Sequence, residues 1–181
     1  MISFRHCAAW RLKRPEGTQK TLARSCSLHS AADSLSFITR DELAKKVIDP
    51  AQRCGLDYLI VDVREPWDYS RLHIRSAVNI PSPLMLTMPA DALLDRLAGA
   101  SARASGKPDD LTTLPGQLIF HCTLSLVRGP TAAVKLIEIL RTARSIKDMP
   151  DISVLDGGFK SWAKAYANDS KLVEGSDAPS A

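Results

Sequence analysis

The sequence predicts an α/β fold in which a parallel sheet is flanked by helices on both faces. Two apolar runs, Tyr58 to Val63 and Leu118 to His121, lack the alternation of polar and apolar residues seen in half-exposed strands. Continuous apolar runs are typical of strands that are buried on both faces of a parallel sheet. Segments with helical spacing lie between the extended ones, and this alternation indicates strands joined by crossover helices.

Short extended segments on either side of these runs complete the predicted sheet. The predicted strands are residues 35–37, 58–63, 77–80, 118–121 and 152–155. The third of them is expected to stop at Pro81, because proline has no N–H to donate to a strand neighbour.

Capping signals and apolar spacing predict the helices. Thr39 and Glu42 have the spacing of a capping box, which opens a helix that continues through Ile48. Further helices are predicted over residues 89–104, 130–144 and 158–166. In the second of these, Pro130 stands in the first turn and Arg141 near the end, where each is favourable.

One domain of ordinary size is expected between two outer segments. It is predicted over residues 33–168, and an apolar content of 45% is enough to form a core. The polar segment 169–181 is predicted to be a disordered tail. Residues 1–32 hold six Lys and Arg against one acidic residue, together with Ser and Thr, which is typical of a mitochondrial transit peptide. The alternative is a disordered basic segment, with the protein in the cytoplasm or the nucleus.

The charge distribution argues against a nucleic-acid partner. The net charge of +4 arises in the first 32 residues, since the remainder has 18 Lys and Arg against 19 Asp and Glu. A nucleic-acid-binding domain would carry its basic patch on the folded part. No apolar stretch approaches eighteen residues, so no membrane span is expected.

The number and spacing of the cysteines are typical of a protein in a reducing compartment and do not indicate a metal site. The four cysteines are too scattered for a disulfide scaffold, no two of them lie close enough for a zinc knuckle, and no two histidines have helical ligand spacing. No metal and no bound cofactor are expected.

The strongest candidate for a functional site is the segment from Cys122 to Arg128, between a predicted strand and a predicted helix. In such folds ligands bind at the carboxyl ends of strands, near helix N-termini. A loop that wraps into a helix N-terminus directs backbone N–H groups inward, and the helix dipole adds positive potential. This field is expected to favour the thiolate form of Cys122 and to bind a tetrahedral oxyanion beside it.

The residues of this segment have distinct expected roles. Cys122 is the expected nucleophile, and the planar fork of Arg128 is expected to grip two oxyanion oxygens. The residues expected to bind substrate are Thr123, Leu124, Ser125, Leu126, Val127 and Arg128. Ser125 either donates to the substrate or the leaving thiolate, or only supports the loop. The spacing of Cys and Arg alone is a weak signal, so the prediction depends on the strand before the loop and the helix after it.

Three sequence blocks occur in a fixed order along the chain. They are Asp62-Val63-Arg64-Glu65-Pro66-Trp67-Asp68-Tyr69 followed by His73-Ile74-Arg75-Ser76-Ala77-Val78-Asn79-Ile80-Pro81, then His121-Cys122 with Arg128-Gly129-Pro130, then Leu155-Asp156-Gly157-Gly158-Phe159 with Trp162. Together they resemble the rhodanese-like domain of the M-phase inducer phosphatases and the eukaryotic arsenate reductases. The resemblance implies a rhodanese-like fold and a catalytic Cys122. It also implies that Asp62, Arg64 and His121 support the loop, and that His73 is a packing residue.

The chain departs from this resemblance at identifiable positions. The loop from Cys122 to Arg128 has seven residues where sulfur-transferring rhodaneses have six, a length that favours phosphate or arsenate. Val63 stands where the cell-cycle phosphatases carry a second cysteine, so their protective disulfide is not expected. No general acid is evident from the sequence, and the candidates by residue type are Asp68, Asp91 and Asp109.

The leading hypothesis is a cysteine-dependent phosphatase of the protein-tyrosine-phosphatase type, acting on phosphotyrosine or aryl phosphates. The main alternative is an arsenate reductase whose reductant is glutathione with glutaredoxin, or a second protein thiol. Cys54 is the other thiol of the predicted domain and is expected to be a small buried hydrophobe. Sulfur transfer and a non-catalytic binding module are further alternatives. The expected partner is a small oxyanion or a phosphoprotein.

Overall fold

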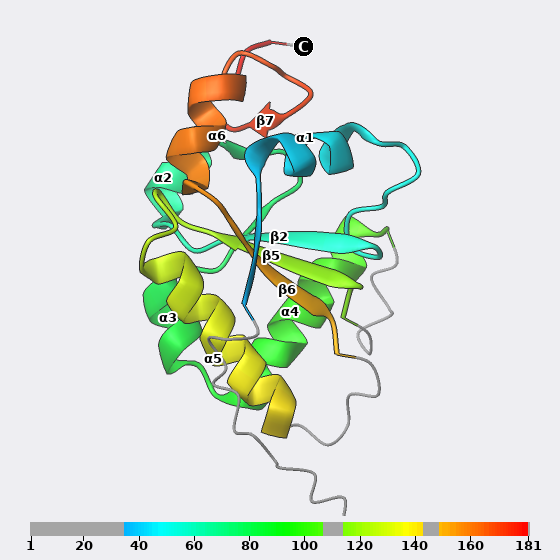
Figure 1. Cartoon of the computed structure of the whole chain (residues 1–181), viewed down its shortest axis with the longest axis vertical. Coiled ribbons are helices and arrows are strands. Elements are labelled where there is room, and N and C mark those ends of the chain that lie inside the picture. The colour runs from blue at the N-terminus through cyan, green and yellow to red at the C-terminus, as the bar shows by residue number, and fades with distance from the viewer. Residues whose placement is uncertain (1–34, 107–113, 143–148, 181) are drawn as a thin grey trace, which may run out of the picture.

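A parallel sheet forms the centre of the molecule (Figure 1). The computed structural model describes residues 35–106, 114–142 and 149–180, and within these residues the sheet has the strand order β1-β6-β5-β2-β4. The strands are β1 (Ser36–Ile38), β6 (Asp151–Leu155), β5 (Gln117–His121), β2 (Tyr58–Asp62) and β4 (Val78–Asn79). All pairings in this sheet are parallel, and β2 and β5 pair along their whole length, from Tyr58 opposite Gln117 to Asp62 opposite His121. The predicted α/β fold with a parallel sheet is therefore confirmed.

Alternate side chains of the central strands pack into two apolar clusters, one on each face of the sheet. Leu59 and Val61 of β2 share one cluster with Phe120 of β5. Ile60 and Ile119 belong to the other cluster. Because successive side chains of a strand point to opposite faces, burial of both sets requires a cover on each side.

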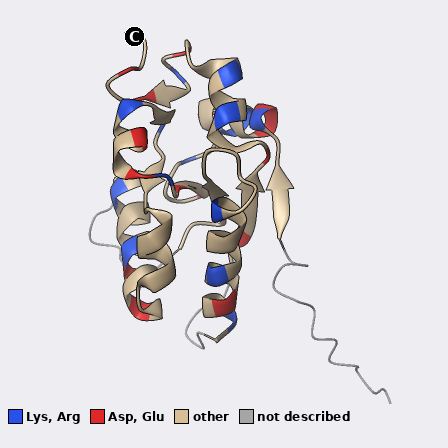
Figure 2. Ribbon diagram, turned by 90° about the vertical axis from the view of Figure 1, so that its left-hand side faces the viewer, with Lys and Arg blue, Asp and Glu red and all other residues tan. Residues whose placement is uncertain are grey.

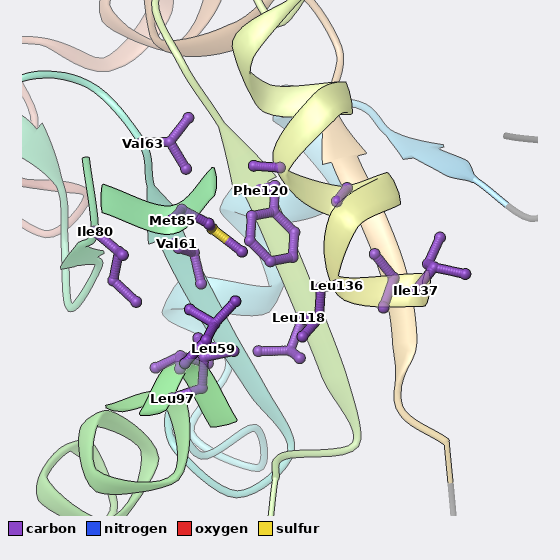
Figure 3. Packing of buried hydrophobic residues seen from close by; sticks show 14 of the residues in the cluster. Leu59, Val61, Val63, Ile80, Met85, Leu97, Leu118, Phe120, Leu136 and Ile137 are labelled. Carbon is purple, nitrogen blue, oxygen red and sulfur yellow. The ribbon is translucent and has the colours of Figure 1, made fainter. Parts of the chain in front are cut away.

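Helices supply both covers. The first face is covered by α3 (Ser82–Thr87), α4 (Ala90–Ala104) and α5 (Arg128–Thr142). Figure 3 shows Met85 of α3, Leu97 of α4 and Leu136 of α5 gathered around Leu59 and Phe120. The second face is covered by α1 (Arg40–Ile48) and α6 (Gly158–Tyr166).

Local signals in the sequence set several helix boundaries correctly. The predicted capping box is present: the Glu42 amide donates to Thr39 Oγ1 at 3.3 Å, and the Thr39 amide donates to Glu42 Oε2 at 2.9 Å. Helices α1 and α6 have the predicted ends, at Ile48 and Tyr166. Helix α5 begins at Arg128 rather than at residue 130, so the arginine is the first residue of the helix.

Short elements of the structure were not predicted. These are α2 (Pro66–Arg71), α3 and β3 (His73–Ile74). Each has six residues or fewer, which is under two helical turns and too short for a periodic apolar pattern. The predicted leader at 1–32 and the loop residues 107–110 lie outside the described residues. Within the described ranges, no helix has the length and apolar character needed to cross a membrane.

The prediction of a disordered tail from residue 169 is wrong for the described part of that segment. Leu172 and Val173 are buried in the same cluster as α1 and α6. Strand β7 (Val173–Glu174) pairs antiparallel with β3, and the Arg75 amide donates to the Leu172 carbonyl at 3.0 Å. The segment is polar on average, yet two adjacent apolar residues suffice to anchor it because the fold offers them a buried position.

Replacing Leu172 with Ala should therefore lower the free energy of unfolding by about 2–5 kcal/mol, the usual cost of removing a buried leucine side chain. The matched control is Lys171→Ala, which changes an exposed neighbour and should shift stability by less than about 0.5 kcal/mol. Urea unfolding followed by circular dichroism measures both. Equal stabilities for the two variants would mean that the tail does not contribute to the fold.

Candidate active site

Cys122 follows β5 directly and lies at the carboxyl edge of the sheet. The loop that it opens ends at Val127, and α5 begins at the next residue. Strand β5 lies between β6 and β2, so the segments that follow these strands surround the loop. The predicted strand–loop–helix arrangement at Cys122 is present.

The loop closes on itself around the sulfur of Cys122. The Ser125 amide donates to Cys122 Sγ at 3.2 Å, and the Cys122 amide donates to Ser125 Oγ at 3.4 Å. Ser125 has a φ of 53°, a left-handed conformation that turns its amide toward the sulfur. Cys122 and Ser125 are both buried, with the whole cysteine only 4% exposed. An N–H directed at the sulfur stabilises negative charge there.

The first turn of α6 holds the carbonyl side of the loop. The amides of Phe159 and Lys160 donate to the carbonyls of Cys122 and Thr123, both at 2.9 Å. These amides belong to the helix N-terminus, where backbone donors have no partner within the helix. The loop carbonyls thus accept hydrogen bonds from the free amides at the start of α6, and these bonds fix the loop.

Gly158 makes this close approach possible. It has a φ of 59°, and a Cβ there would lie 2.6 Å from the Cys122 carbonyl oxygen and 2.8 Å from the Ser125 amide nitrogen. Only glycine fits between helix and loop at that spacing. The Gly-Gly pair appeared in the sequence as part of a family resemblance, and its contact with the loop was not predicted.

Arg128 spans the loop from the helix side. Its guanidinium Nη2 donates to Thr123 Oγ1 at 3.1 Å, which ties the first residue of α5 to the residue after Cys122. The side chain is partly exposed. The structure therefore brings Cys122, Thr123, Ser125 and Arg128 together, whereas Leu124, Leu126 and Val127 expose their side chains.

A buried ion pair between Asp62 and Arg64 supports the start of α6, which holds the loop. Arg64 Nη2 lies 2.6 Å from Asp62 Oδ2, and Arg64 Nε donates to both carboxylate oxygens at 2.9 and 3.0 Å. The Arg64 guanidinium also lies over the Phe159 ring, 3.7 Å from its centroid, and donates to the Leu72 carbonyl at 2.8 Å. Burial opposes ionisation of Asp62, but the charges of His121, when protonated, and of Arg64, with the Arg64 hydrogen bonds, hold the pKa of Asp62 below its usual value.

His121 lies beside this pair and is completely buried. Its Nε2 is 3.7 Å from Asp62 Oδ2, and within the described part of the chain neither ring nitrogen has a hydrogen-bond partner. Burial lowers the pKa of His121 in spite of the nearby Asp62 carboxylate, which favours the neutral ring in the folded protein. His121 thus packs under the loop, next to Phe159, whose ring centroid is 6.1 Å away.

The remaining candidate residues lie on other elements of the fold or outside the described residues. His73 stacks on Tyr69 with ring centroids 3.8 Å apart, and its Nδ1 lies 2.7 Å from the Tyr69 carbonyl oxygen, which is the arrangement of a packing residue. Asp68 is half-buried in α2, Asp91 is exposed in the first turn of α4, and Asp109 lies outside the described residues.

Cys54 is at the other end of the sheet. It forms an isolated bridge with Tyr58, at the amino end of β2, whereas Cys122 follows the residue opposite Asp62 at the carboxyl end. The two thiols are therefore separated by at least the length of β2, roughly 13 Å at about 3.3 Å per residue. Burial raises the pKa of the Cys54 thiol to about 11. Cys54 cannot reach Cys122 in this fold.

The rhodanese-like domain family matches residues 39–165. The chain belongs to the rhodanese-like domain family. The match runs from the N-cap of α1 to the last turn of α6 and includes the Cys122 loop. Within the described residues, no group of three or more His, Cys, Asp or Glu side chains is placed to hold a metal ion.

Relatives of this rhodanese-like protein are named for two chemistries. The dual specificity phosphatase ibp1 of Schizosaccharomyces pombe is 30% identical over 155 residues, covering 78% of this chain and 97% of the relative. Arsenate reductase 2.2 of Oryza sativa subsp. japonica is 28% identical over 131 residues, covering 72% and 84%. Among solved structures, a yeast protein tyrosine phosphatase of the rhodanese family aligns with a TM-score of 0.58 and 27% identity, over 78% of this chain and 93% of that one.

Substituting Gly158 with Ala should displace the loop, because the new Cβ would overlap its backbone. The expected loss in unfolding free energy is about 1–3 kcal/mol, with shifted amide resonances for residues 122–127 in ¹H–¹⁵N spectra. Gly106→Ala is the matched control, since Gly106 has a φ of 73° but no atom within 4 Å of the added Cβ. It should lose about 1 kcal/mol and leave the loop resonances unchanged. Unshifted loop resonances in Gly158→Ala would refute the contact.

The neutral, buried His121 should make stability depend on pH. Below the usual histidine pKa of 6.5 the unfolded chain binds a proton at His121 more readily than the folded chain, because the folded pKa is lowered, so stability should decrease as the pH falls from about 7 to 5.5. The slope from this one group reaches at most about 1.4 kcal/mol per pH unit. In His121→Leu the unfolding free energy should decrease less between about pH 7 and 5.5, because the contribution of His121 is absent. Urea unfolding at each pH measures this. An unchanged slope would show that His121 protonates in the fold.

Proposed function

We propose that this protein is a cysteine-dependent phosphatase of the protein-tyrosine-phosphatase type, with Cys122 as nucleophile and Arg128 as oxyanion-binding side chain. The observation that carries the proposal is the hydrogen bond from the Ser125 amide to Cys122 Sγ, in a loop between a strand end and a helix N-terminus. A backbone N–H directed at the sulfur next to a helix N-terminus is the kind of environment that supports attack of a thiolate on a phosphate ester.

The loop supports a reaction in two chemical steps. In the first step the Cys122 thiolate attacks phosphorus, an S–P bond forms, the ester P–O bond breaks, and the leaving oxygen takes up a proton from solvent. In the second step water attacks phosphorus and gives up a proton to solvent, the S–P bond breaks, inorganic phosphate is released, and the thiolate is regenerated. The loop amides and Arg128 stabilise charge on the equatorial oxygens in both transition states. The Ser125 amide stabilises the sulfur as nucleophile and as leaving group.

The second candidate function is arsenate reduction, which the relationship to arsenate reductase 2.2 favours. Arsenate is a tetrahedral oxyanion like phosphate, so the same loop would bind it. Cys122 would form an S–As bond while an As–O bond breaks and the oxygen leaves as water. The remote position of Cys54 excludes it from resolving that adduct in this fold. The reductase would therefore take its electrons from glutathione with glutaredoxin, or from another thiol.

Replacement of Cys122 by Ser should reduce hydrolysis of p-nitrophenyl phosphate by at least about 10³-fold, because the serine hydroxyl is not ionised at neutral pH. Arg128→Lys keeps the charge but loses the bidentate fork, and should lower kcat by about 10²-fold. Cys54→Ser is the matched control and should retain wild-type turnover.

Parallel assays separate the remaining alternatives. Arsenate is offered with glutathione and glutaredoxin, and thiosulfate with cyanide, under the same conditions. Phosphate ester turnover that survives in Cys122→Ser would contradict the mechanism. Turnover of arsenate alone would replace the phosphatase by the reductase, and inactivity in all three assays would favour a binding module.

A further inference from the structure

We propose that the rim of the Cys122 loop binds apolar side chains next to a phosphotyrosine, so that the substrate is a phosphoprotein segment with apolar residues flanking the phosphorylated one. This inference rests on the proposed phosphatase function and names its substrate class. It depends on exposed apolar side chains that the mechanism above does not use. They form what we call the apolar collar: Trp67, Leu84, Leu86, Leu124, Leu126 and Val127.

The collar residues lie on segments that follow three adjacent strands. Trp67 is in α2, after β2, whereas Leu84 and Leu86 are in α3, after β4. Leu126 is in the loop after β5. In the sheet these strands are neighbours in the order β5-β2-β4, and their carboxyl ends meet at the edge where Cys122 lies. Helix α3 also packs against α5, which starts at the end of the loop.

Figure 1 places α2, α3 and the start of α5 on the same side of the molecule. Figure 2 looks at that side, and Figure 1 agrees with the sheet order in placing these segments around one face.

Exposure of the collar has no structural explanation within the described residues. Leu126 is 75% exposed, Val127 68% and Trp67 64%, so these side chains add little to the core. Loops at the ends of strands are ordinarily polar, and clustered exposed apolar side chains mark binding surfaces. The remaining large exposed hydrophobics of the described ranges, Phe37, Ile48 and Met149, lie outside the segments that follow β2, β4 and β5.

The position of the collar favours a substrate larger than an inorganic oxyanion. Arsenate or phosphate alone would contact the loop amides and Arg128, and would leave the collar in water. A phosphotyrosine in a peptide places its neighbouring residues around the loop, where apolar side chains would bury collar surface. Each buried leucine-sized side chain contributes enough to raise specificity roughly tenfold or more.

The charges around the collar favour a neutral, apolar peptide over an acidic peptide or an anionic membrane. The collar segments, residues 65–71, 82–87 and 123–128, hold the acidic side chains Glu65 and Asp68 and the cations Arg71 and Arg128. The exposed Lys160 of α6 lies beside the loop, where its amide donates to the Thr123 carbonyl. Arg71 is paired with Asp177 at 3.0 Å and Arg128 is assigned to the phosphate, so Lys160 alone faces two acidic side chains. Binding to acidic peptides or to anionic lipids requires an excess of cations near the apolar residues.

The test compares phosphotyrosine peptides of equal length that carry Leu, Ser or Glu at the positions flanking phosphotyrosine, with Lys at the ends of the Glu peptide so that the net charges are equal. With the full chain, kcat/KM should be at least about tenfold higher for the Leu peptide than for the Ser peptide, and lowest for the Glu peptide. In Trp67→Ser combined with Leu86→Ser, this preference should fall to within about twofold. Turnover of p-nitrophenyl phosphate by that variant should stay near wild type, which also verifies that it folds. Ile48→Ser, an exposed apolar change on α1, is the matched control and should keep the preference.

Equal kcat/KM for the three peptides, or a preference that survives in the double variant, would overturn the inference. If the wild-type chain hydrolyses neither p-nitrophenyl phosphate nor any peptide, the proposed function fails. The collar is then tested by fluorescence anisotropy with the same labelled peptides, where equal affinities would overturn it. Two further outcomes would also overturn the inference if they occur without a peptide preference and are lost in the double variant. Binding to phosphatidylcholine vesicles would assign the collar to a lipid surface. Self-association in sedimentation would assign it to a second copy of the chain.

Discussion

Two backbone hydrogen bonds, from the first turn of α6 to the carbonyls of Cys122 and Thr123, fix the loop on which the site depends. They form because Gly158 lets the helix approach the loop backbone more closely than any side chain would allow. With its carbonyls engaged by α6, the loop keeps the Ser125 amide directed at the Cys122 sulfur. The environment of the sulfur is thus built from backbone groups, which need no side-chain rearrangement to act.

The ion pair of Asp62 and Arg64 connects the start of α6 to the end of strand β2. Arg64 packs on Phe159, the residue whose amide holds the Cys122 carbonyl, so the pair supports the loop through the start of α6. A buried ion pair is weak evidence for net stability, because desolvation offsets much of its attraction. Its contribution here is positional: the guanidinium is fixed by the carboxylate and by the Leu72 carbonyl, and the Phe159 ring is fixed by the guanidinium.

Much of the fold was predictable because it follows from local patterns. The continuous apolar runs predicted β2 and β5, and the capping box predicted the start of α1. The strand before Cys122 and the helix after it located the loop. The contact of Gly158 with the loop was not predictable, because it joins residues 36 positions apart and leaves no periodic signal. The anchoring of Leu172 was missed for a similar reason: its burial depends on a position that only the assembled fold provides.

A crystal structure of the Cys122→Ser protein with tungstate would show whether the Cys122 loop binds a tetrahedral oxyanion. We expect a tungstate ion within about 3.5 Å of residue 122, held by backbone N–H groups of residues 123–128 and by both terminal nitrogens of Arg128. Tungstate bound only elsewhere, or a loop whose carbonyls rather than amides face the ion, would show that the loop is not an oxyanion site.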